Sequence, residues 1–174
     1  MKFYKKISFI FIILIIFQTN LSADVPYYLD FKYVLNQSDA GKKAQDHFKK
    51  KLDNGAKMLQ KKEKALQEEE IKIIQQKKVI SAEEYKKKVT DLRKKVQSLQ
   101  KERNSLLSEV AKQRSKAKKE LLANLNPIIK EYMKEKNIRI VLDKKSVIVA
   151  DESLDITQNI VKLLNSKLKS IKLN

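Results

Sequence analysis

Lysine dominates the chemistry that this chain can offer. Its 174 residues include 39 Lys and Arg against 21 Asp and Glu, which gives a formal net charge of +18 at pH 7. A surface of that sign attracts acidic partners over long distances. Each exposed ion pair contributes only about 0–1 kcal/mol. The excess of positive charge therefore sets the electrostatic field around the protein, but it does not identify the ligand.

Side chains that could carry catalysis or hold a metal are scarce. His47 is the single histidine, cysteine is absent, and no nucleophile elbow of the GxSxG type occurs. Without cysteine the chain can form neither a disulfide nor a thiolate metal site. The phosphate-binding patterns GxxxxGKS/T and GxGxxG are also missing. We therefore expect no enzyme activity, no cofactor and no metal, with His47 as an exposed helix residue.

The candidate binding lysines lie in a stretch that favours long helices. Between Gly55 and Pro127 the chain contains neither glycine nor proline, and 34% of all residues are charged. Any one of these lysines is most simply a solvated position on a helix, but together they predict basic helix faces. The candidates for contact with an acidic partner are Lys61, Lys62, Lys77, Lys78, Lys86, Lys87, Lys88, Lys94, Lys95, Lys112, Lys116, Lys118 and Lys119.

The first 23 residues have the three parts of a secretory signal peptide. A lysine-rich start is followed by the apolar run Ile7–Phe17 and by a polar stretch that ends in the small residue Ala23. A membrane span needs roughly 20 apolar residues, so this run is short for an uncleaved anchor, which is the alternative. We expect cleavage between Ala23 and Asp24 and secretion across the inner membrane.

Apolar residues recur every seven positions along the stretch that carries the lysines. One series begins at Tyr85 and continues through Leu92, Leu99 and Leu106, and a companion series begins at Val89. This spacing is typical of a coiled coil. An earlier series, spaced by seven from residue 52 to residue 80, has charged residues at several companion positions. The first half of the stretch therefore predicts a looser contact than the second half.

A helix-start signal separates the two halves. Ser81-Ala82-Glu83-Glu84 fits a capping box, in which the serine hydroxyl bonds the amide of the glutamate. A helix that starts inside a charged run implies that the chain turns just before it, near residues 77–80. We therefore predict an antiparallel arm with a first helix over 41–80 and a second over 81–136, and the roughly 40 residues of the first helix span about 60 Å. One continuous helix is the alternative.

The start of the mature chain is expected to supply one part of a small head. Within residues 24–40, Val25–Leu29 has the pattern of a short strand and Phe31–Asn36 that of a short helix. Ser38 or Asp39 can cap the long helix that follows.

The end of the chain, residues 137–174, is expected to supply the other part of the head. The β-branched run Ile138–Leu142 and the segment Ser146–Val149 predict two strands of a hairpin. Asp155 then precedes an amphipathic terminal helix. The expected fold is mainly α with a small β head (α+β).

So few short strands bury little apolar surface by themselves, which favours self-association of the head. Packing inside a single head is the alternative role for the residues concerned. The candidate oligomerisation residues are Tyr27, Leu29, Ile140, Leu142 and Val147.

Short motifs along the mature chain resemble the Skp/OmpH family. They follow the family's order and span nearly the whole mature chain, although Pro26 in the opening strand departs from the pattern. The motifs are Ser38-x-Ala40-Gly41-Lys42, Leu125-x-Pro127-Ile128, Val141-Leu142-Asp143-Lys144, Val147-x-Val149-Ala150-Asp151 and Ser153-Leu154-Asp155-Ile156-Thr157.

This resemblance implies a jellyfish-like homotrimer, in which strands from three heads form a common body and three helical hairpins enclose a basic cavity. It also implies an ATP-independent holdase chaperone of the periplasm. Such a chaperone binds unfolded outer-membrane β-barrel proteins and prevents their aggregation before membrane assembly. The arm lysines would then contact the client, and the strand residues would join the chain to its own copies.

Three other functions remain open. Nucleic-acid binding fits the charge, but the signal peptide opposes it, and Tyr85 apart, aromatic side chains are not interleaved with the arm lysines. We therefore expect no nucleic-acid partner. A structural coiled-coil protein of the envelope is the second alternative. Recognition of anionic lipid or lipopolysaccharide is the third, and it is compatible with chaperoning.

Overall fold

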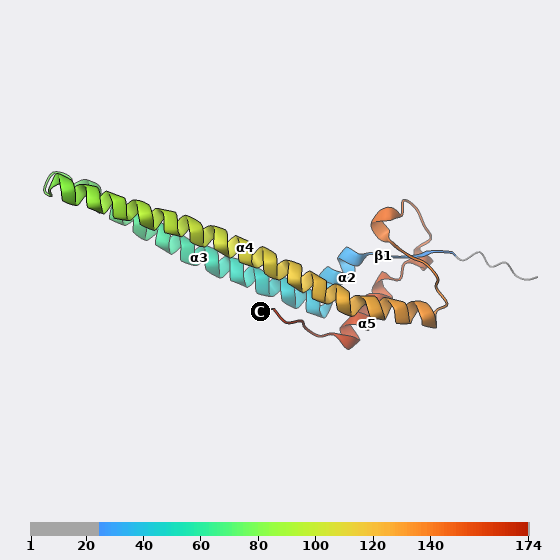
Figure 1. Cartoon of the computed structure of the whole chain (residues 1–174). Helices are drawn as coiled ribbons and strands as arrows, with labels where there is room; N and C mark the ends of the chain where they lie inside the picture. The colour runs from blue at the N-terminus through green and yellow to red at the C-terminus, as the bar shows by residue number, and fades with distance from the viewer. Residues whose placement is uncertain (1–24, 174) are drawn as a thin grey trace, which may run out of the picture.

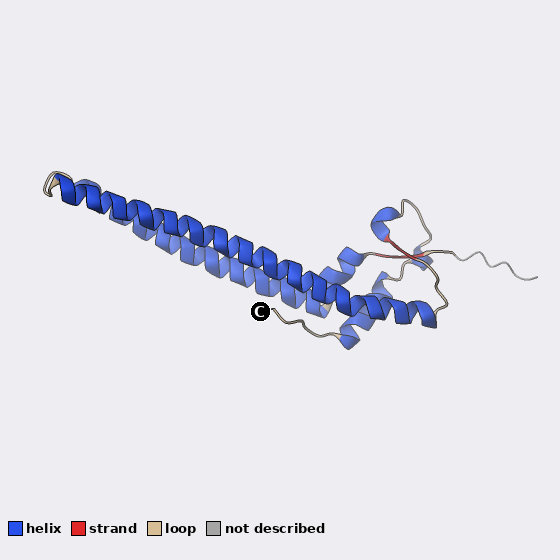
Figure 2. Ribbon diagram, in the orientation of Figure 1, coloured by secondary structure: helices blue, strands red, loops and turns tan. Residues whose placement is uncertain are grey.

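Two long antiparallel helices dominate the computed structural model, which describes residues 25–173 (Figures 1 and 2). The long helical hairpin and the small stranded head predicted from the sequence are confirmed. The expected signal peptide and its cleavage site at Ala23 and Asp24 lie outside the described residues. In chain order the elements are β1 (Tyr27–Leu29), α2 (Phe31–Gln37), α3 (Asp39–Gln76), α4 (Ala82–Glu135), β2 (Val141–Asp143), the 3-10 turns η1 (Lys144–Ser146) and η2 (Glu152–Leu154), and α5 (Thr157–Lys167).

The turn between α3 and α4 occupies residues 77–81, at the end of the molecule farthest from the head (Figure 1). Ser81 has extended backbone, and its hydroxyl accepts a hydrogen bond of 3.1 Å from the Glu84 amide. Glu83 and Glu84 lie in the first turn of α4, where the helix dipole favours negative charge. Local capping chemistry therefore begins α4 where the sequence predicted it. Within residues 25–173, no helix is long and apolar enough to cross a membrane.

Ser81→Ala is expected to loosen the first turn of α4 by about 1 kcal/mol, the usual effect of losing a serine cap. Hydrogen exchange at the amides of residues 82–86 should then become roughly fivefold faster, while the head amides stay unchanged. Ser81→Asp keeps a capping oxygen and serves as the control. Equal exchange rates in the alanine variant and the native chain would show that the serine cap contributes nothing.

The corner between α2 and α3 is unusually tight. Ser38 is fully buried there; its hydroxyl accepts a hydrogen bond of 3.2 Å from the Gly41 amide, and its own amide donates to Val34. A Cβ atom added at Gly41 would lie 1.8 Å from the carbonyl oxygen of Leu35. Glycine is therefore required at this position by the close approach of α2.

The head core lies between α2, α5, β1 and the last turns of α4. Its fully buried side chains are Leu29, Val34, Leu125, Ile160 and Leu164. The apolar face predicted for the terminal helix is therefore the face that α5 packs into the head.

The sheet differs from the one predicted. β1 pairs with β2 in parallel, with Tyr27 opposite Val141, and Tyr28 forms an isolated bridge to Asp155. The second strand starts at Val141 rather than at Ile138. The predicted strand Ser146–Val149 and its hairpin are wrong, because the structure contains no strand over those residues.

The missing strand has a local cause. The Asp143 carboxylate accepts a hydrogen bond of 3.2 Å from the Lys145 amide, and this bond starts the 3-10 turn η1 directly after β2. The chain leaves the sheet there, and Ile148 and Val149 are 99% and 89% exposed. A β-branched run makes a strand only where a neighbouring strand can pair with it.

The C-terminal segment returns from α5 along the base of the hairpin (Figure 1). Ile171 and Leu173 pack against the apolar cluster that includes Phe48 and Val110. The Lys172 amide donates a hydrogen bond of 3.2 Å to the Glu120 carboxylate. The end of the chain therefore braces the arm where it joins the head.

Candidate functional site

We call the helix pair α3 and α4 the arm. Leu59, Leu99 and Val110 are buried between the two helices, so these heptad residues form the interior of the arm. A Cβ atom added at Gly55 would lie 2.3 Å from Cδ2 of Leu106, which shows how closely the helices approach. We call this buried contact between the two helices the seam. The surface available for binding therefore lies on the two sides of the seam.

Ion pairs across the seam mark one side of the arm. The α3 residues of these pairs are Lys51, Lys62 and Glu69, which follow one another at intervals of eleven and seven residues. Both intervals are close to whole numbers of helical turns, so the three residues lie on one stripe of α3. We call this the ion-paired side. The pairs are Lys51–Glu109 at 2.7 Å, Lys62–Glu102 at 2.5 Å and Lys95–Glu69 at 2.7 Å.

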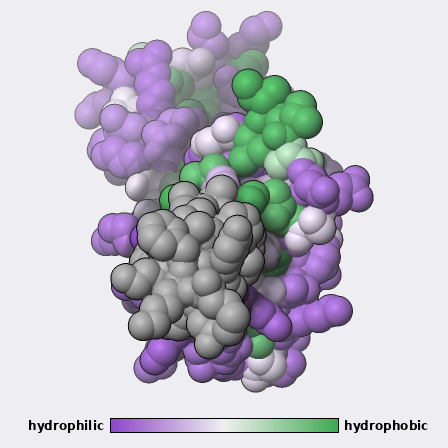
Figure 3. Space-filling model, turned by 90° about the vertical axis from the view of Figure 1, so that its right-hand side faces the viewer, coloured by the Kyte–Doolittle hydropathy of each residue, from purple (hydrophilic) through white to green (hydrophobic). Residues whose placement is uncertain are grey.

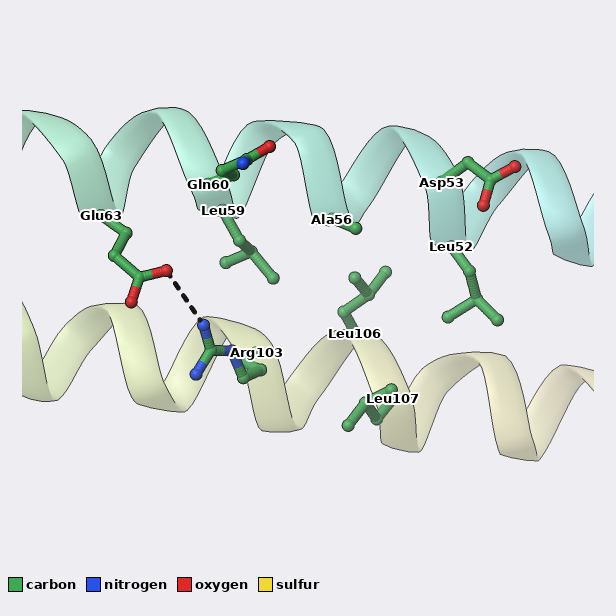
Figure 4. A pocket seen from close by; sticks show the side chains of 9 residues that line it. All are labelled: Leu52, Asp53, Ala56, Leu59, Gln60, Glu63, Arg103, Leu106 and Leu107. Atoms are coloured by element: carbon green, nitrogen blue, oxygen red, sulfur yellow. Dashed lines mark hydrogen bonds and ion pairs between the residues drawn. The ribbon is translucent and has the colours of Figure 1, made fainter.

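Two hollows open on the other side of the arm, one of about 380 Å³ and one of about 400 Å³. Gln60 and Gln67 line these hollows. Each stands two residues before an ion-paired residue, Lys62 or Glu69, and therefore lies about 160° away from it around the axis of α3. Among the side chains that line the first hollow, Leu52, Leu59 and Leu106 lie between the facing helices in Figure 4. We call the two hollows together the groove; it is lined by side chains from residues 52–70 of α3 and 92–107 of α4.

One ion pair lies between the two hollows. Arg103 is 3.4 Å from the Glu63 carboxylate, and both residues line both hollows (Figure 4). Both side chains are about half exposed, so the pair adds at most about 1 kcal/mol. The two hollows therefore adjoin each other, with a weak polar crossing between them.

Exposed apolar side chains make the walls of the groove. Val96 and Leu107 line it and are 50% and 56% exposed. Ile71 and Ile74, also exposed, stand four and seven residues after Gln67 and continue the same side towards the turn. On the ion-paired side Met58 is similarly exposed, at 51%, but it lines neither hollow.

The predicted lysines are distributed around the arm. All are exposed except the half-buried Lys88, and none lines the groove. Lys62 and Lys95 are bound across the seam, Lys88 and Lys94 pair with acids on α4, and Lys77 lies over the Tyr85 ring. Those that form no ion pair with a described residue are Lys61, Lys78, Lys86, Lys87, Lys112, Lys116, Lys118 and Lys119.

The sequence analysis missed the two arginines of the groove, Arg93 and Arg103. A signal for Arg103 was present, because it interrupts the companion heptad series on α4. Glu63 interrupts the corresponding series on α3. Opposite charges at seam positions of two antiparallel helices favour a pair across the seam.

The turn end of the arm carries a second exposed feature. Val79 is 80% exposed on the turn, and Ile74, in the last turn of α3, is also exposed. Lys77 and Lys78 lie between them in the sequence, and both lysines are exposed. We call this apolar and basic end the tip.

The candidate oligomerisation residues separate into two groups. Leu29 is fully buried in the core of a single head, and Tyr27 packs beside that core. Ile140 and Leu142 are exposed, and Val147 is half-buried. Apolar surface is visible at this end of the molecule (Figure 3), and β2 pairs on one edge only, with β1.

Charged groups of the head fix the loop after β2. Lys144 lies 2.8 Å from the Asp155 carboxylate and over the Tyr28 ring. Burial raises the pKa of Asp155, but hydrogen bonds from Lys144 and Thr157 outweigh it and leave the pKa below its usual value. The same bond raises the pKa of Lys144. These groups hold the loop in place.

The described part of the chain offers no candidate metal centre. Residues 25–173 contain no group of three or more His, Asp or Glu that could hold a metal ion. His47 is exposed on α3, with its ring edge-on to Phe48 at 5.6 Å.

Comparison with known proteins agrees with this architecture. Residues 27–164 match the model of the family described as outer membrane protein (OmpH-like). A solved structure from Caulobacter crescentus CB15, assigned as an outer membrane chaperone (OmpH-like), has the same fold. The two structures superpose with a TM-score of 0.80, and the two sequences are 21% identical. The match covers 91% of this chain and 95% of the Caulobacter chain. No curated protein matches the chain. Because the family match runs from β1 into α5, the chain belongs to the OmpH-like family of outer membrane proteins.

Proposed function

We propose that the chain is an ATP-independent holdase chaperone of the periplasm. It binds unfolded outer-membrane β-barrel proteins and prevents their aggregation before membrane assembly. The observation that carries this proposal is the groove, which exposes Val96 and Leu107 on an arm surrounded by unpaired lysines. Membership of the OmpH-like family supports it, as does the chaperone assignment of the similar Caulobacter structure.

The physical basis is competition with aggregation. Unfolded β-barrel segments expose apolar side chains and unpaired strand edges, which associate with one another readily. Apolar walls on the arm can cover such segments, while exposed lysines attract acidic parts of the client at about 0–1 kcal/mol each. Because each contact is weak, the client stays mobile and can leave without ATP.

Self-association through the head completes this proposal. The open edge of β2, the exposed Ile140 and Leu142 beside it, and the exposed Ile148 and Val149 together form apolar surface that a second copy could cover. A homotrimer would bring three arms around one basic cavity. Ile140 and Leu142 would then lie at the contact between copies, whereas Leu29 would support that contact from inside each head.

A light-scattering assay tests the holdase activity. An outer-membrane β-barrel protein unfolded in urea is diluted into buffer with or without the mature chain, which begins at Asp24. We expect the mature chain to suppress scattering and to lose this ability gradually at high salt, because salt screens the lysines. Undiminished scattering at saturating amounts of the chain would contradict the proposal and favour a structural coiled-coil protein that binds folded partners.

Binding to an anionic membrane surface is a second candidate function, and the tip favours it. Val79 and Ile74 are exposed beside Lys77 and Lys78, a combination that suits the boundary between lipid headgroups and acyl chains. The mature chain should co-sediment with vesicles that contain anionic lipid and not with zwitterionic vesicles. Val79→Asp should abolish this binding and leave holdase activity unchanged. Equal binding to both kinds of vesicle would contradict it.

A further inference from the structure

We propose that the groove, and not the ion-paired side, seats one extended client segment with alternating apolar and polar residues, of about the length of a single membrane-spanning β-strand. This inference rests on the proposed holdase function and specifies which surface of the arm performs it and which sequence pattern that surface accepts.

The length of the groove matches one strand. Its lining on α3 extends from Leu52 to Glu70, which corresponds to about 27 Å at 1.5 Å per residue. An extended chain rises about 3.3 Å per residue, so roughly eight residues fit along it. Strands that cross an outer membrane have about 9–11 residues. The groove therefore covers most of one strand and is too short for two strands placed end to end.

The shape of the groove suits a chain with alternating side chains. The groove is open to solvent along its length, so it contacts only one side of the client. Side chains at alternate positions of an extended chain point to the same side. Apolar residues of the client would enter the two hollows between Leu52 and Leu107 and beside Val96, while the residues between them point into water. Membrane strands have this alternating pattern.

Polar groups in the groove suit an extended backbone. Gln60, Gln67 and Gln100 line the hollows, and a side-chain amide can both donate and accept hydrogen bonds. An unpaired strand offers N–H and C=O groups along its edges whatever its sequence. Amides can therefore satisfy the client backbone without selecting particular residues. Near the middle of the groove, the weak Glu63–Arg103 pair can exchange with charges of the client.

The ion-paired side lacks these features. Its lysines Lys51, Lys62 and Lys95 are already bound to carboxylates of the facing helix. Met58 is an exposed apolar residue there, yet it borders neither hollow. The cations of this side that lie at the seam are thus already paired, and Met58 lies outside both hollows, which makes Met58 a matched control for Leu107 and Val96.

The test compares Leu107→Asp and Val96→Asp with Met58→Asp in the mature chain. The three native side chains are about equally exposed, so equal melting temperatures are expected and would be verified first. Affinity for a urea-unfolded outer-membrane β-barrel protein should fall about tenfold or more in the two groove variants, the equivalent of losing one well-buried apolar contact. It should change less than about twofold in the Met58 variant.

Competition with peptides tests the pattern. A peptide of about ten residues, the length of one strand, with alternating apolar and polar residues should displace the client. A peptide of the same composition with its apolar residues in one block should do so poorly. Equal losses in the Met58 and Leu107 variants, or equal competition by both peptides, would overturn the inference while the holdase function stands. Failure of the native chain to bind any unfolded client would instead overturn the proposed function.

Discussion

Gly41→Ala is expected to destabilise the head by about 3 kcal/mol, the upper part of the range for overpacking. The added Cβ would lie 1.8 Å from the carbonyl oxygen of Leu35. A backbone atom cannot rotate away, so α2 would have to move and the buried hydrogen bond between Ser38 and the Gly41 amide would be disturbed. Urea unfolding followed by circular dichroism measures the effect.

Gly55→Ala is the matched control, because it also replaces a helical glycine of α3. Its added Cβ would approach Cδ2 of Leu106 at 2.3 Å, which is the end of a flexible side chain. Alanine also favours the helix by about 1 kcal/mol over glycine. We expect a net change below about 1 kcal/mol at Gly55. Equal losses in the two variants would show that the corner at Gly41 is not the tight point of the structure.

Leu29→Ala is expected to cost about 2–5 kcal/mol, since it removes a fully buried side chain from the centre of the head. A domain of this kind has a total stability of about 5–15 kcal/mol, so the variant should unfold at a much lower urea concentration. The loss should be similar at low and high protein concentration, because the contacts of Leu29 lie within one chain.

Leu142→Ala provides the contrast. Leu142 is exposed on β2, beside the open edge of the sheet. Its replacement should change the stability of a single chain by less than about 0.5 kcal/mol and yet weaken self-association. Sedimentation velocity at several concentrations measures the association. A Leu142 variant that unfolds as easily as the Leu29 variant and still associates normally would place Leu142 inside the head.

Local signals in the sequence were sufficient for the arm. The cap at Ser81 placed the turn because a serine hydroxyl and the following helix amides interact within one helical turn. The heptad series from Tyr85 to Leu106 gave the seam because its spacing depends only on helix geometry. Asp30 likewise begins α2, with its carboxylate accepting a hydrogen bond of 2.7 Å from the Tyr33 amide.

Features that depend on contacts between residues far apart in the sequence could not be predicted in this way. The run Val147–Val149 has strong strand propensity, yet η1 turns the chain away before it can pair. Leu29 was a candidate for a contact between copies, with packing inside one head as the alternative, because a strand residue gives no indication of which neighbour will cover it. Here α4 and α5 of the same chain cover it.

The proposed binding surface could not be inferred from the composition. Lysine is so abundant that its clusters indicate basic helices without indicating which side binds. The distinction between the groove and the ion-paired side depends on how α3 and α4 are placed against each other. Pairs such as Lys62–Glu102 and Lys95–Glu69 neutralise one side, and this follows from the alignment of the two helices rather than from either helix alone.

Native mass spectrometry of the mature chain tests the holdase account most directly. The chain is measured alone and after a urea-unfolded outer-membrane β-barrel protein has been diluted into it. The account predicts three copies alone and three copies with one client bound. A stable oligomer that ignores the unfolded client, or a chain that stays a monomer and binds nothing, would contradict it.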